Sequence, residues 1–242
     1  MRIKGIISYN GKDFFGYQIQ KNIEQRSVQK EIQDVLSKIL NEDVKIYSSG
    51  RTDRGVHALN QVIHFDMNKK MSIEKLKHAL NSLLPDDIFV KSLEEVDDEF
   101  HSRFSAKRKE YKYIINLGEY DPINKDLVYN LNHSLDEKLI NSSLPLFIGE
   151  HSFINFCSNN DGDYVRTIYD FRMVKEGSLL IFYIQGNGFR RYMVRMIIGT
   201  LIALGEGKIT LEEIDSLINS SLEKRVSFKA PAEGLYLNIV EY

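Results

Sequence analysis

Cysteine and tryptophan are almost absent from this sequence: its 242 residues include one cysteine, Cys157, and no tryptophan. One cysteine can form neither an internal disulfide nor a thiolate cage for a metal ion, which favours a reducing, cytoplasmic compartment and a packing role for Cys157. A long hydrophobic run is also missing, because the longest one, near 196–204, is interrupted by glycine and is too short to cross a bilayer. No apolar stretch follows a basic start. These absences argue against secretion and membrane insertion.

A surplus of positive charge is missing as well. The chain has 32 Lys and Arg against 34 Asp and Glu, a formal net charge of -2 and a pI near 6.3, which by itself argues against a nucleic-acid-binding protein. The charge is nevertheless uneven, with an acidic run at 94–99 and basic groups at 103–112, 190–195 and 224–229. Folding could gather the basic groups into one cleft, although each group alone is equally explained as a solvated face.

With 43% hydrophobic residues the chain can bury a proper core in one large or two small domains. Strand-like and helix-like patterns alternate, with neither an internal sequence repeat nor a linker rich in proline, glycine or serine. The predicted strands are 1–8, 44–47, 61–66, 86–96, 111–117, 167–175, 179–185 and 235–240; the predicted helices are 28–40, 73–84, 135–144, 189–204 and a short one after Thr210. The similar order of elements in the two halves predicts an α+β fold: a largely antiparallel sheet with flanking helices and two halves related by pseudo-twofold symmetry.

The most informative segment is 48–66, in which Gly50 and Gly55 bracket a cation, a hydroxyl and a carboxylate. The glycines permit a tight turn that presents side chains outward, so Asp53 is predicted to lie on a loop between two strands. Taken locally, this is also what an ordinary turn with the solvated cations Arg51 and Arg54 looks like.

Residues 50–53, 55–58 and 61–62 resemble the active-site signature of the tRNA pseudouridine synthase A family. The resemblance implies that Asp53 is the catalytic nucleophile and that the chain has the pseudouridine synthase fold. It also implies two halves, 1–107 with the Asp loop and 108–242 with the remaining active-site residues, that together make one catalytic unit.

Four other segments resemble the same family. Near the start, 8–11, 15–20 and 27–29 match its opening motif, with Tyr17 where the family usually carries tryptophan. Residues 100–106 and 109–113 match the stretch that supplies the substrate-stacking tyrosine, a role that falls on Tyr111. Residues 186–189, 193–195 and 199–201 resemble the segment whose arginine pairs with the catalytic carboxylate, which assigns Arg195. Residues 230–237 resemble the C-terminal segment of the family, with Ala232 where a second proline is common.

The implied reaction isomerises uridine to pseudouridine: the bond from ribose to base N1 breaks and is remade through C5. It needs no cofactor and no metal, and the chain has no phosphate-binding glycine loop. His57 and His64 are spaced to point to opposite faces of one strand, which disfavours a metal site. Asp53 could attack ribose C1′, add to uracil C6 or assist proton removal at C2′, and the sequence leaves these three open.

The other candidate residues follow from the same reaction. Arg195 would keep Asp53 ionised and aimed, because a guanidinium grips both carboxylate oxygens. Tyr111 would stack on a flipped-out uracil; read without the resemblance it is a core aromatic, a role that better suits Tyr113 on the same strand face. Arg51 would contact the phosphate of the flipped nucleotide, help to expel the base, or only support the turn. Candidate contacts to the RNA backbone are Arg103, Lys107, Arg108, Lys109, Arg190 and Arg191.

The family resemblance implies a homodimer that acts on uridines at positions 38, 39 and 40 of the tRNA anticodon stem-loop, with one tRNA contacting both subunits. Basic strips from two subunits could then combine into one groove. Arg54, Arg190 and Arg191 depart from the family pattern and keep a different target open, such as ribosomal RNA or another tRNA position. Two further alternatives are a non-catalytic RNA-binding or tRNA-folding protein and a small-molecule glycosidase; the latter would need a second carboxylate, for which Asp66 is the nearest candidate.

Overall fold

The structure is a computed structural model that describes residues 1–20, 25–68, 71–158, 162–219 and 224–242. It divides into two compact units: unit 1 is Met1–Lys107 with Tyr236–Tyr242, and unit 2 is Arg108–Leu235.

The last residues of the chain lie in unit 1, whereas the sequence analysis groups them with the second half. The reason is backbone pairing, since Tyr236 and Leu237 pair in parallel with His57 and Ala58. The C-terminal strand therefore extends the sheet that carries the Asp53 loop.

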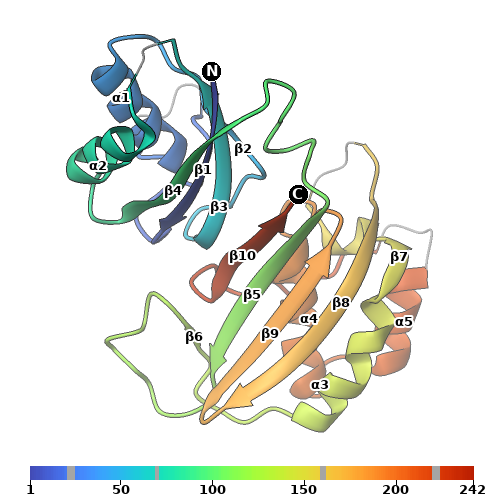
Figure 1. Cartoon of the computed structure of the whole chain (residues 1–242). Helices are drawn as coiled ribbons and strands as arrows, with labels where there is room; N and C mark the ends of the chain where they lie inside the picture. The colour runs from blue at the N-terminus through green and yellow to red at the C-terminus, as the bar shows by residue number, and fades with distance from the viewer. Residues whose placement is uncertain (21–24, 69–70, 159–161, 220–223) are drawn as a thin grey trace. The chain divides into compact units, whose positions relative to one another are not determined.

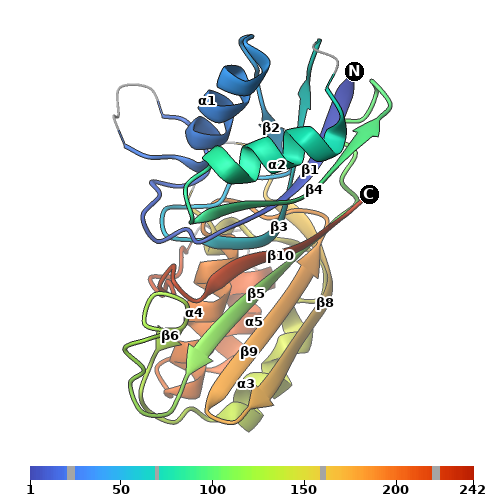
Figure 2. The same cartoon turned by 60° about the vertical axis from the view of Figure 1, so that its left-hand side comes forward.

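Unit 1 is a sheet with the strand order β4-β1-β3-β10, in which β1 is antiparallel to both β3 and β4, and the short β2 pairs with β3. Helices α1 and α2 lie on one face of this sheet (Figures 1 and 2). The bounds are β1 Arg2–Tyr9, α1 Val28–Leu40, β2 Tyr47–Ser48, β3 His57–Asp66, α2 Ile73–Leu83, β4 Ile88–Val96 and β10 Leu235–Glu241.

Local sequence explains the elements of unit 1. Strand β1 alternates buried and partly exposed residues, as a strand covered on one face should. Helix α1 begins at the predicted cap, where the Ser27 hydroxyl accepts a hydrogen bond from the Lys30 amide, and it ends at Asn41 in a left-handed conformation with φ 57°. Its buried residues, Val28, Ile32, Leu36 and Leu40, recur at helical spacing.

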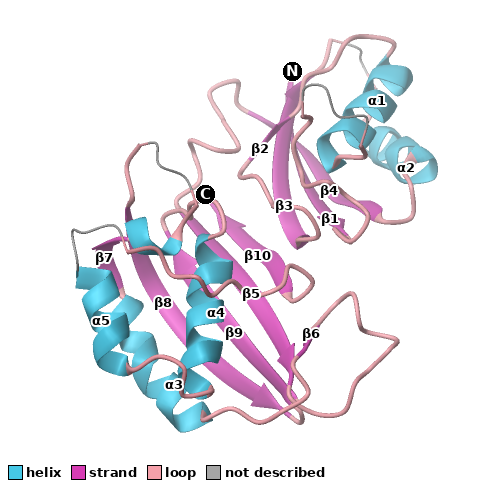
Figure 3. Ribbon diagram, turned by 180° about the vertical axis from the view of Figure 1, so that it is seen from behind, coloured by secondary structure: helices cyan, strands magenta, loops and turns pink. Residues whose placement is uncertain are grey.

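Unit 2 is an antiparallel sheet with the strand order β5-β9-β8-β7, and the short β6 runs parallel to β5. Helices α3, α4 and α5 lie over one face of this sheet, as Figure 3 shows. The bounds are β5 Arg108–Asn116, β6 Tyr129–Asn130, α3 Glu137–Ser143, a 3₁₀ helix Leu144–Phe147, β7 Gly149–Ser152, a 3₁₀ helix Ile154–Phe156, β8 Val165–Glu176, β9 Leu179–Gly186, α4 Met193–Gly205 and α5 Leu211–Asn219.

Several boundaries in unit 2 differ from the predicted ones. Helix α4 begins at Met193 rather than at 189, because Tyr192 has a left-handed backbone with φ 64°. Pro145 does end α3, but it does so inside a 3₁₀ turn. The β8–β9 hairpin turns at Gly177, with φ 61°, as predicted. No sequence pattern predicted β7 or the two-residue β6.

In unit 1, β3 starts at His57, four residues before the predicted strand, and the predicted strand 44–47 is reduced to the two-residue β2.

The α+β class, with a mostly antiparallel sheet and flanking helices, is confirmed, whereas the pseudo-twofold relation of the halves stays a prediction. Helix α4 contains the longest hydrophobic run of the chain and is buried on nearly all sides, as a helix that is apolar all round should be. Cys157 is buried too. In the described ranges, no helix is long and apolar enough to cross a bilayer.

Candidate active site

Asp53 lies in the loop between β2 and β3, as predicted. The Val56 amide donates a hydrogen bond to the Asp53 carbonyl over 3.1 Å, and Gly55, with φ 78°, occupies the third position of this turn. A positive φ at that position is what a type II turn requires and explains the glycine. Asp53 itself is partly exposed while Thr52 and Val56 are buried, so the loop is fixed from within and the carboxylate-bearing residue stays accessible.

The segment around Gly16 supports the loop from one side. The Tyr17 amide donates to the Thr52 carbonyl over 3.1 Å, and the Gly55 amide donates to the Phe14 carbonyl over 3.4 Å. Gly16 has φ 96°, and a Cβ atom there would lie 2.9 Å from the Thr52 carbonyl oxygen. Only glycine fits between these backbones without displacing the residue before Asp53.

Buried polar side chains hold the other flank of the loop. The Gly50 carbonyl accepts a hydrogen bond from Gln61 Nε2 over 2.8 Å and one from Ser48 Oγ over 3.0 Å. Gln61 is fully buried, and its Oε1 accepts from Ser49 Oγ over 2.5 Å. A buried amide with these partners fixes the strand that enters the loop.

Thr52 is anchored by a phenol. Its Oγ1 shares a hydrogen bond of 2.8 Å with the hydroxyl of Tyr9, and burial raises the pKa of that tyrosine well above its usual range. The Tyr9 hydroxyl therefore stays protonated and acts as a neutral hydrogen-bonding group.

His57, at the start of β3, is a structural residue. Its Nδ1 accepts a hydrogen bond from the Gly11 amide over 3.0 Å, and its ring stacks on Tyr236 with centroids 4.7 Å apart. Because Nδ1 is an acceptor here, that nitrogen carries no proton. Burial also raises the pKa of Tyr236 to about 12. His57 belongs to the segment that resembles the family signature, and its contacts connect the end of the Asp53 loop to β10.

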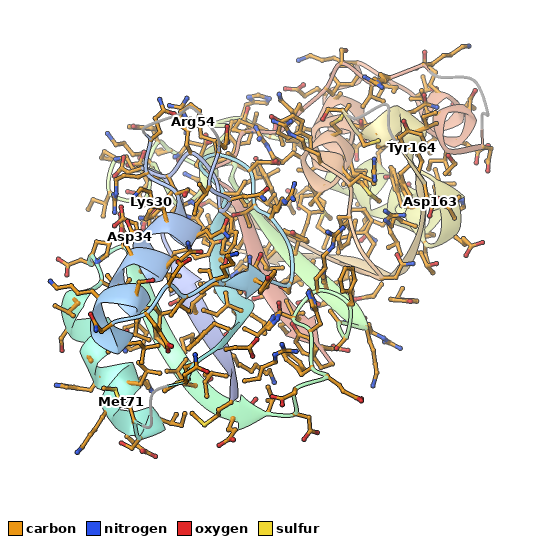
Figure 4. All side chains as sticks on the ribbon, turned by 90° about the horizontal axis from the view of Figure 1, so that it is seen from above. Lys30, Asp34, Arg54, Met71, Asp163 and Tyr164 are labelled. Carbon is orange, nitrogen blue, oxygen red and sulfur yellow. The ribbon has the colours of Figure 1, made fainter. Side chains whose placement is uncertain are left out.

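Arg54, a departure from the family pattern, packs on its own unit. Its guanidinium carbon lies 4.3 Å from the centroid of the Phe15 ring, a cation–π contact, and Figure 4 labels the residue on its surface loop. Arg51 is exposed two residues before Asp53. Arg103, also in unit 1, is exposed with its guanidinium carbon 5.6 Å from the Phe104 ring.

Tyr111 lies on β5 in unit 2, in register with Ile184 on β9. Its ring contacts Phe189 edge to face with centroids 5.2 Å apart, and 9% of its surface is exposed. Tyr113 is only 1% exposed, and its hydroxyl donates to the Pro231 carbonyl over 2.8 Å. The expectation that Tyr113 is the core member of the pair is confirmed, and Tyr111 lies at the border of the core.

Arg195 projects from the first turns of α4 against the segment 228–230. Its Nε donates to the Ala230 carbonyl over 2.8 Å, and the Ala230 amide donates to the Arg195 carbonyl over 2.9 Å. This close approach depends on Gly199, where a Cβ atom would lie 2.7 Å from the Lys229 amide nitrogen. The Nε contact leaves both Nη groups of Arg195 to act as a fork for an anion.

Lys107 is the last residue of the first segment of unit 1, and the remaining predicted contacts lie in unit 2. Arg190 is partly exposed, with its guanidinium carbon 5.4 Å from the ring of Tyr164, which Figure 4 labels. Arg191 is exposed, and Lys109 is partly exposed on β5. Unit 1 thus supplies Asp53, Arg51, Arg103 and Lys107, and unit 2 supplies Tyr111, Arg195 and the other candidates.

Tyr192 and Lys229 were not singled out from the sequence. Tyr192 precedes α4 in a left-handed conformation, and the Lys229 ammonium lies 4.6 Å from its ring centroid. A sequence signal for this contact is hard to find, because the two residues are far apart along the chain and neither is a glycine or a helix cap of a preferred type.

Comparison with known proteins agrees with the motifs. The tRNA pseudouridine synthase family matches residues 6–105 and 144–242. The tRNA pseudouridine synthase A of Anoxybacillus flavithermus is 43% identical over 244 residues, covering 100% of this chain and 98% of its own. The tRNA pseudouridine synthase A 1 of a Bacillus cereus strain is 40% identical over 245 residues, with the same coverage. Among solved structures, a Cbf5-Nop10-Gar1 complex aligns with a TM-score of 0.35 and 15% identity, over 82% of this chain and 53% of that one.

The chain has an α+β fold, carries a glycine-flanked aspartate on a loop held by hydrogen bonds, and matches this family over most of its length. These features define an RNA-modifying isomerase. The chain belongs to the tRNA pseudouridine synthase family. Tyr111 lies between the two ranges that the family matches, but within the full-length alignments to the two relatives.

Proposed function

We propose that this chain isomerises uridine to pseudouridine at positions 38, 39 and 40 of the tRNA anticodon stem-loop, with Asp53 as the nucleophile and without a cofactor or metal. The observation that carries the proposal is the Asp53 loop, in which a partly exposed aspartate sits on a backbone fixed by Gly16, Gln61 and the Gly55 turn. The names of the full-length relatives give the substrate class.

In the proposed reaction the target uridine leaves its stack, and Tyr111 supports the extruded base. The glycosidic bond from C1′ to N1 breaks, the uracil turns, and a bond from C1′ to C5 forms. The proton on C5 leaves to solvent and N1 gains one, so no electrons are exchanged with another molecule. Arg195, whose Nε is already bonded to the Ala230 carbonyl, turns its remaining N–H groups to the Asp53 carboxylate and keeps it ionised.

Arg51, Arg103, Lys109, Arg190 and Arg191 are proposed to contact the RNA backbone. Such contacts position the substrate without reading its sequence, and they make binding depend on salt. The enzyme is proposed to act in the cytoplasm as a homodimer in which one tRNA contacts both subunits. Sedimentation of the protein with and without tRNA tests this stoichiometry, and a complex of one protomer with one tRNA would contradict it.

The test is release of tritium from tRNA transcripts labelled with [5-³H]uridine, because C5 loses its hydrogen only when the new bond forms. The wild-type protein should release tritium, and replacing the anticodon-stem uridines one at a time should locate the targets. Asp53→Ala should abolish release while tRNA binding survives. Asp86→Asn, which alters an exposed carboxylate in the same unit, is the matched control and should keep full turnover.

Release from ribosomal RNA alone would show that the chemistry is right and the target wrong. Equal loss of binding and turnover in Asp53→Ala would contradict a dedicated catalytic role. If the wild-type protein binds tRNA but releases tritium from no RNA, a non-catalytic RNA-binding protein would be the better description.

A further inference from the structure

Tyr192 has an unusual backbone for its residue type. Its φ is 64° and its ψ is -1°, in the left-handed region, and its side chain does not cap the helix α4 that follows it. A left-handed conformation costs an ordinary L-residue about 1–2 kcal/mol. Asparagine or glycine would adopt it more readily. Such a conformation persists only where surrounding contacts hold it, and it commonly accompanies a functional site.

The ring of Tyr192 is surrounded by three cations. The charged groups of Arg191, Arg195 and Lys229 lie 4.8, 5.5 and 4.6 Å from its centroid. No two of the three charges can therefore be more than about 10 Å apart. We call these four residues the Tyr192 cluster.

No carboxylate among the described residues of unit 2 neutralises two of these cations, Arg195 and Lys229. In the described part of unit 2, neither Arg195 nor Lys229 forms an ion pair with a carboxylate. Burial raises the pKa of Tyr113, Glu233 raises it further and Arg195 lowers it. Among the described residues, Glu233 pairs with neither Arg195 nor Lys229. Like charges this close repel one another, so a bound anion would stabilise the cluster.

The Tyr192 ring restrains the cations around it. The Tyr192 hydroxyl accepts a hydrogen bond from Arg191 Nη2 over 3.0 Å, and Arg191 and Lys229 are both exposed. Contact with an aromatic face restrains a cation while leaving its charge in place. The conformational entropy of ordering two long side chains is then partly lost before the ligand arrives.

From this geometry we propose that the Tyr192 cluster binds one phosphate of the substrate RNA backbone, held by Arg191 and Lys229 and positioned by the Tyr192 ring. Because the ring also contacts Arg195, the phosphate lies close to the catalytic arginine and belongs to the target nucleotide or a neighbour. The identity of the ligand rests on the proposed function, since the RNA is the substrate named there. Lys229 is thus a binding residue, and Tyr192 is a positioning residue.

The test measures tRNA binding as a function of salt in an Asp53→Ala background, where no turnover occurs. A contact with one phosphate adds roughly 0.7–0.9 to the slope of log affinity against log salt. Lys229→Ala should reduce the slope by that amount, so its affinity deficit should shrink roughly threefold between 50 and 200 mM salt. Lys229→Arg should restore the slope. Lys138→Ala removes an exposed lysine on α3 and should match the parent at every salt concentration.

A second variant separates the ring from the charge. Tyr192→Gly removes the aromatic surface and relieves the left-handed backbone, so the melting temperature should not fall by more than a few degrees. Affinity for tRNA should nevertheless drop at least threefold, although no charge has been removed. Unchanged affinity in Tyr192→Gly would overturn the role of the ring, and an unchanged slope in Lys229→Ala would overturn the phosphate site.

The two proposals fail separately. If the wild-type protein releases tritium from tRNA and Lys229→Ala keeps the parental slope, the phosphate site is wrong and the function stands. If no RNA releases tritium but tRNA binds with a slope that depends on Lys229, the site stands and the function is wrong.

Discussion

Replacing Gly16 with alanine should damage the Asp53 loop without touching Asp53. Gly16 has φ 96°, and the added Cβ would lie 2.9 Å from the Thr52 carbonyl oxygen and 3.4 Å from the Arg54 amide nitrogen. Both contacts are to backbone, so no side chain can rotate to make room. The loop must move by about 0.5 Å to restore an ordinary van der Waals contact.

The magnitude has two parts. A positive φ costs alanine about 1–3 kcal/mol, and forcing an extra methyl group into a packed site costs a further 1–3 kcal/mol or so. For a chain of this size, each kcal/mol lowers the melting temperature by roughly 2–4 °C, so Gly16→Ala should melt roughly 10 °C below the wild type. A displacement of 1 Å can cost about a hundredfold in rate, and half of that displacement suggests a loss of roughly tenfold.

Gly177→Ala is the matched control, because Gly177 also has a positive φ, 61°, but no atom lies within 4 Å of its added Cβ. It should lose only the backbone term, roughly 4 °C, and keep full turnover. Melting is followed by circular dichroism, and turnover by tritium release under single-turnover conditions. If the two variants lose the same stability and both stay fully active, the claim that Gly16 supports the Asp53 loop is refuted.

Three further predictions concern single side chains. Arg195→Lys should lower the single-turnover rate about a hundredfold, because one ammonium cannot donate to the Ala230 carbonyl and also bind both oxygens of a carboxylate. A loss below threefold would contradict the proposal that the two Nη groups of Arg195 bind the Asp53 carboxylate. Tyr111→Phe should bind tRNA within twofold of wild type yet turn over more slowly, whereas Tyr111→Ala should also lose the ~1–3 kcal/mol of base stacking. Equal turnover in wild type and Tyr111→Phe would show that the Tyr111 hydroxyl has no role in the reaction and that only the ring contributes. Burial, followed by the charges of His101 and Arg2, lowers the pKa of His64 to about 4, below its value near 6.5 in the unfolded chain. As the pH falls, the unfolded chain therefore takes up the proton first, and the free energy of unfolding should fall by about 2 kcal/mol between pH 7.5 and pH 5.0. Urea titrations at the two pH values measure this loss. His64→Gln should remove it, and an unchanged pH dependence in that variant would refute the assignment of the loss to His64.

The Asp53 loop could be predicted from sequence because its determinants are local. The glycine spacing predicts a tight turn, and Gly55 adopts the positive φ that the turn needs. The support from Gly16 is a contact between backbones distant in sequence, so neither periodicity nor turn chemistry could predict it. The roles of Asp53, Tyr111 and Arg195 in catalysis stay predictions that the experiments above test.

Helix α4 shows where local rules stop. Its apolar run predicted a helix, but not its first residue, because Tyr192 takes a conformation that tyrosine rarely adopts. The contacts that hold it come partly from Lys229, beyond α5 in the chain. The C-terminal strand is a similar case, since its pairing with His57 and Ala58 depends on tertiary contacts that its own alternating pattern does not encode.

The net charge of -2 argued against an RNA substrate, and the structure explains why that argument is weak. A basic residue can be ordered by a carboxylate, which cancels its charge, or by an aromatic ring, which does not. Arg2 is of the first kind, with Asp66 as its partner at 2.9 Å. Lys229 and Arg103 are of the second kind, lying over Tyr192 and Phe104. A chain with almost equal numbers of acids and bases can therefore keep ordered, uncancelled cations at chosen places, and its binding is better predicted from those places than from its net charge.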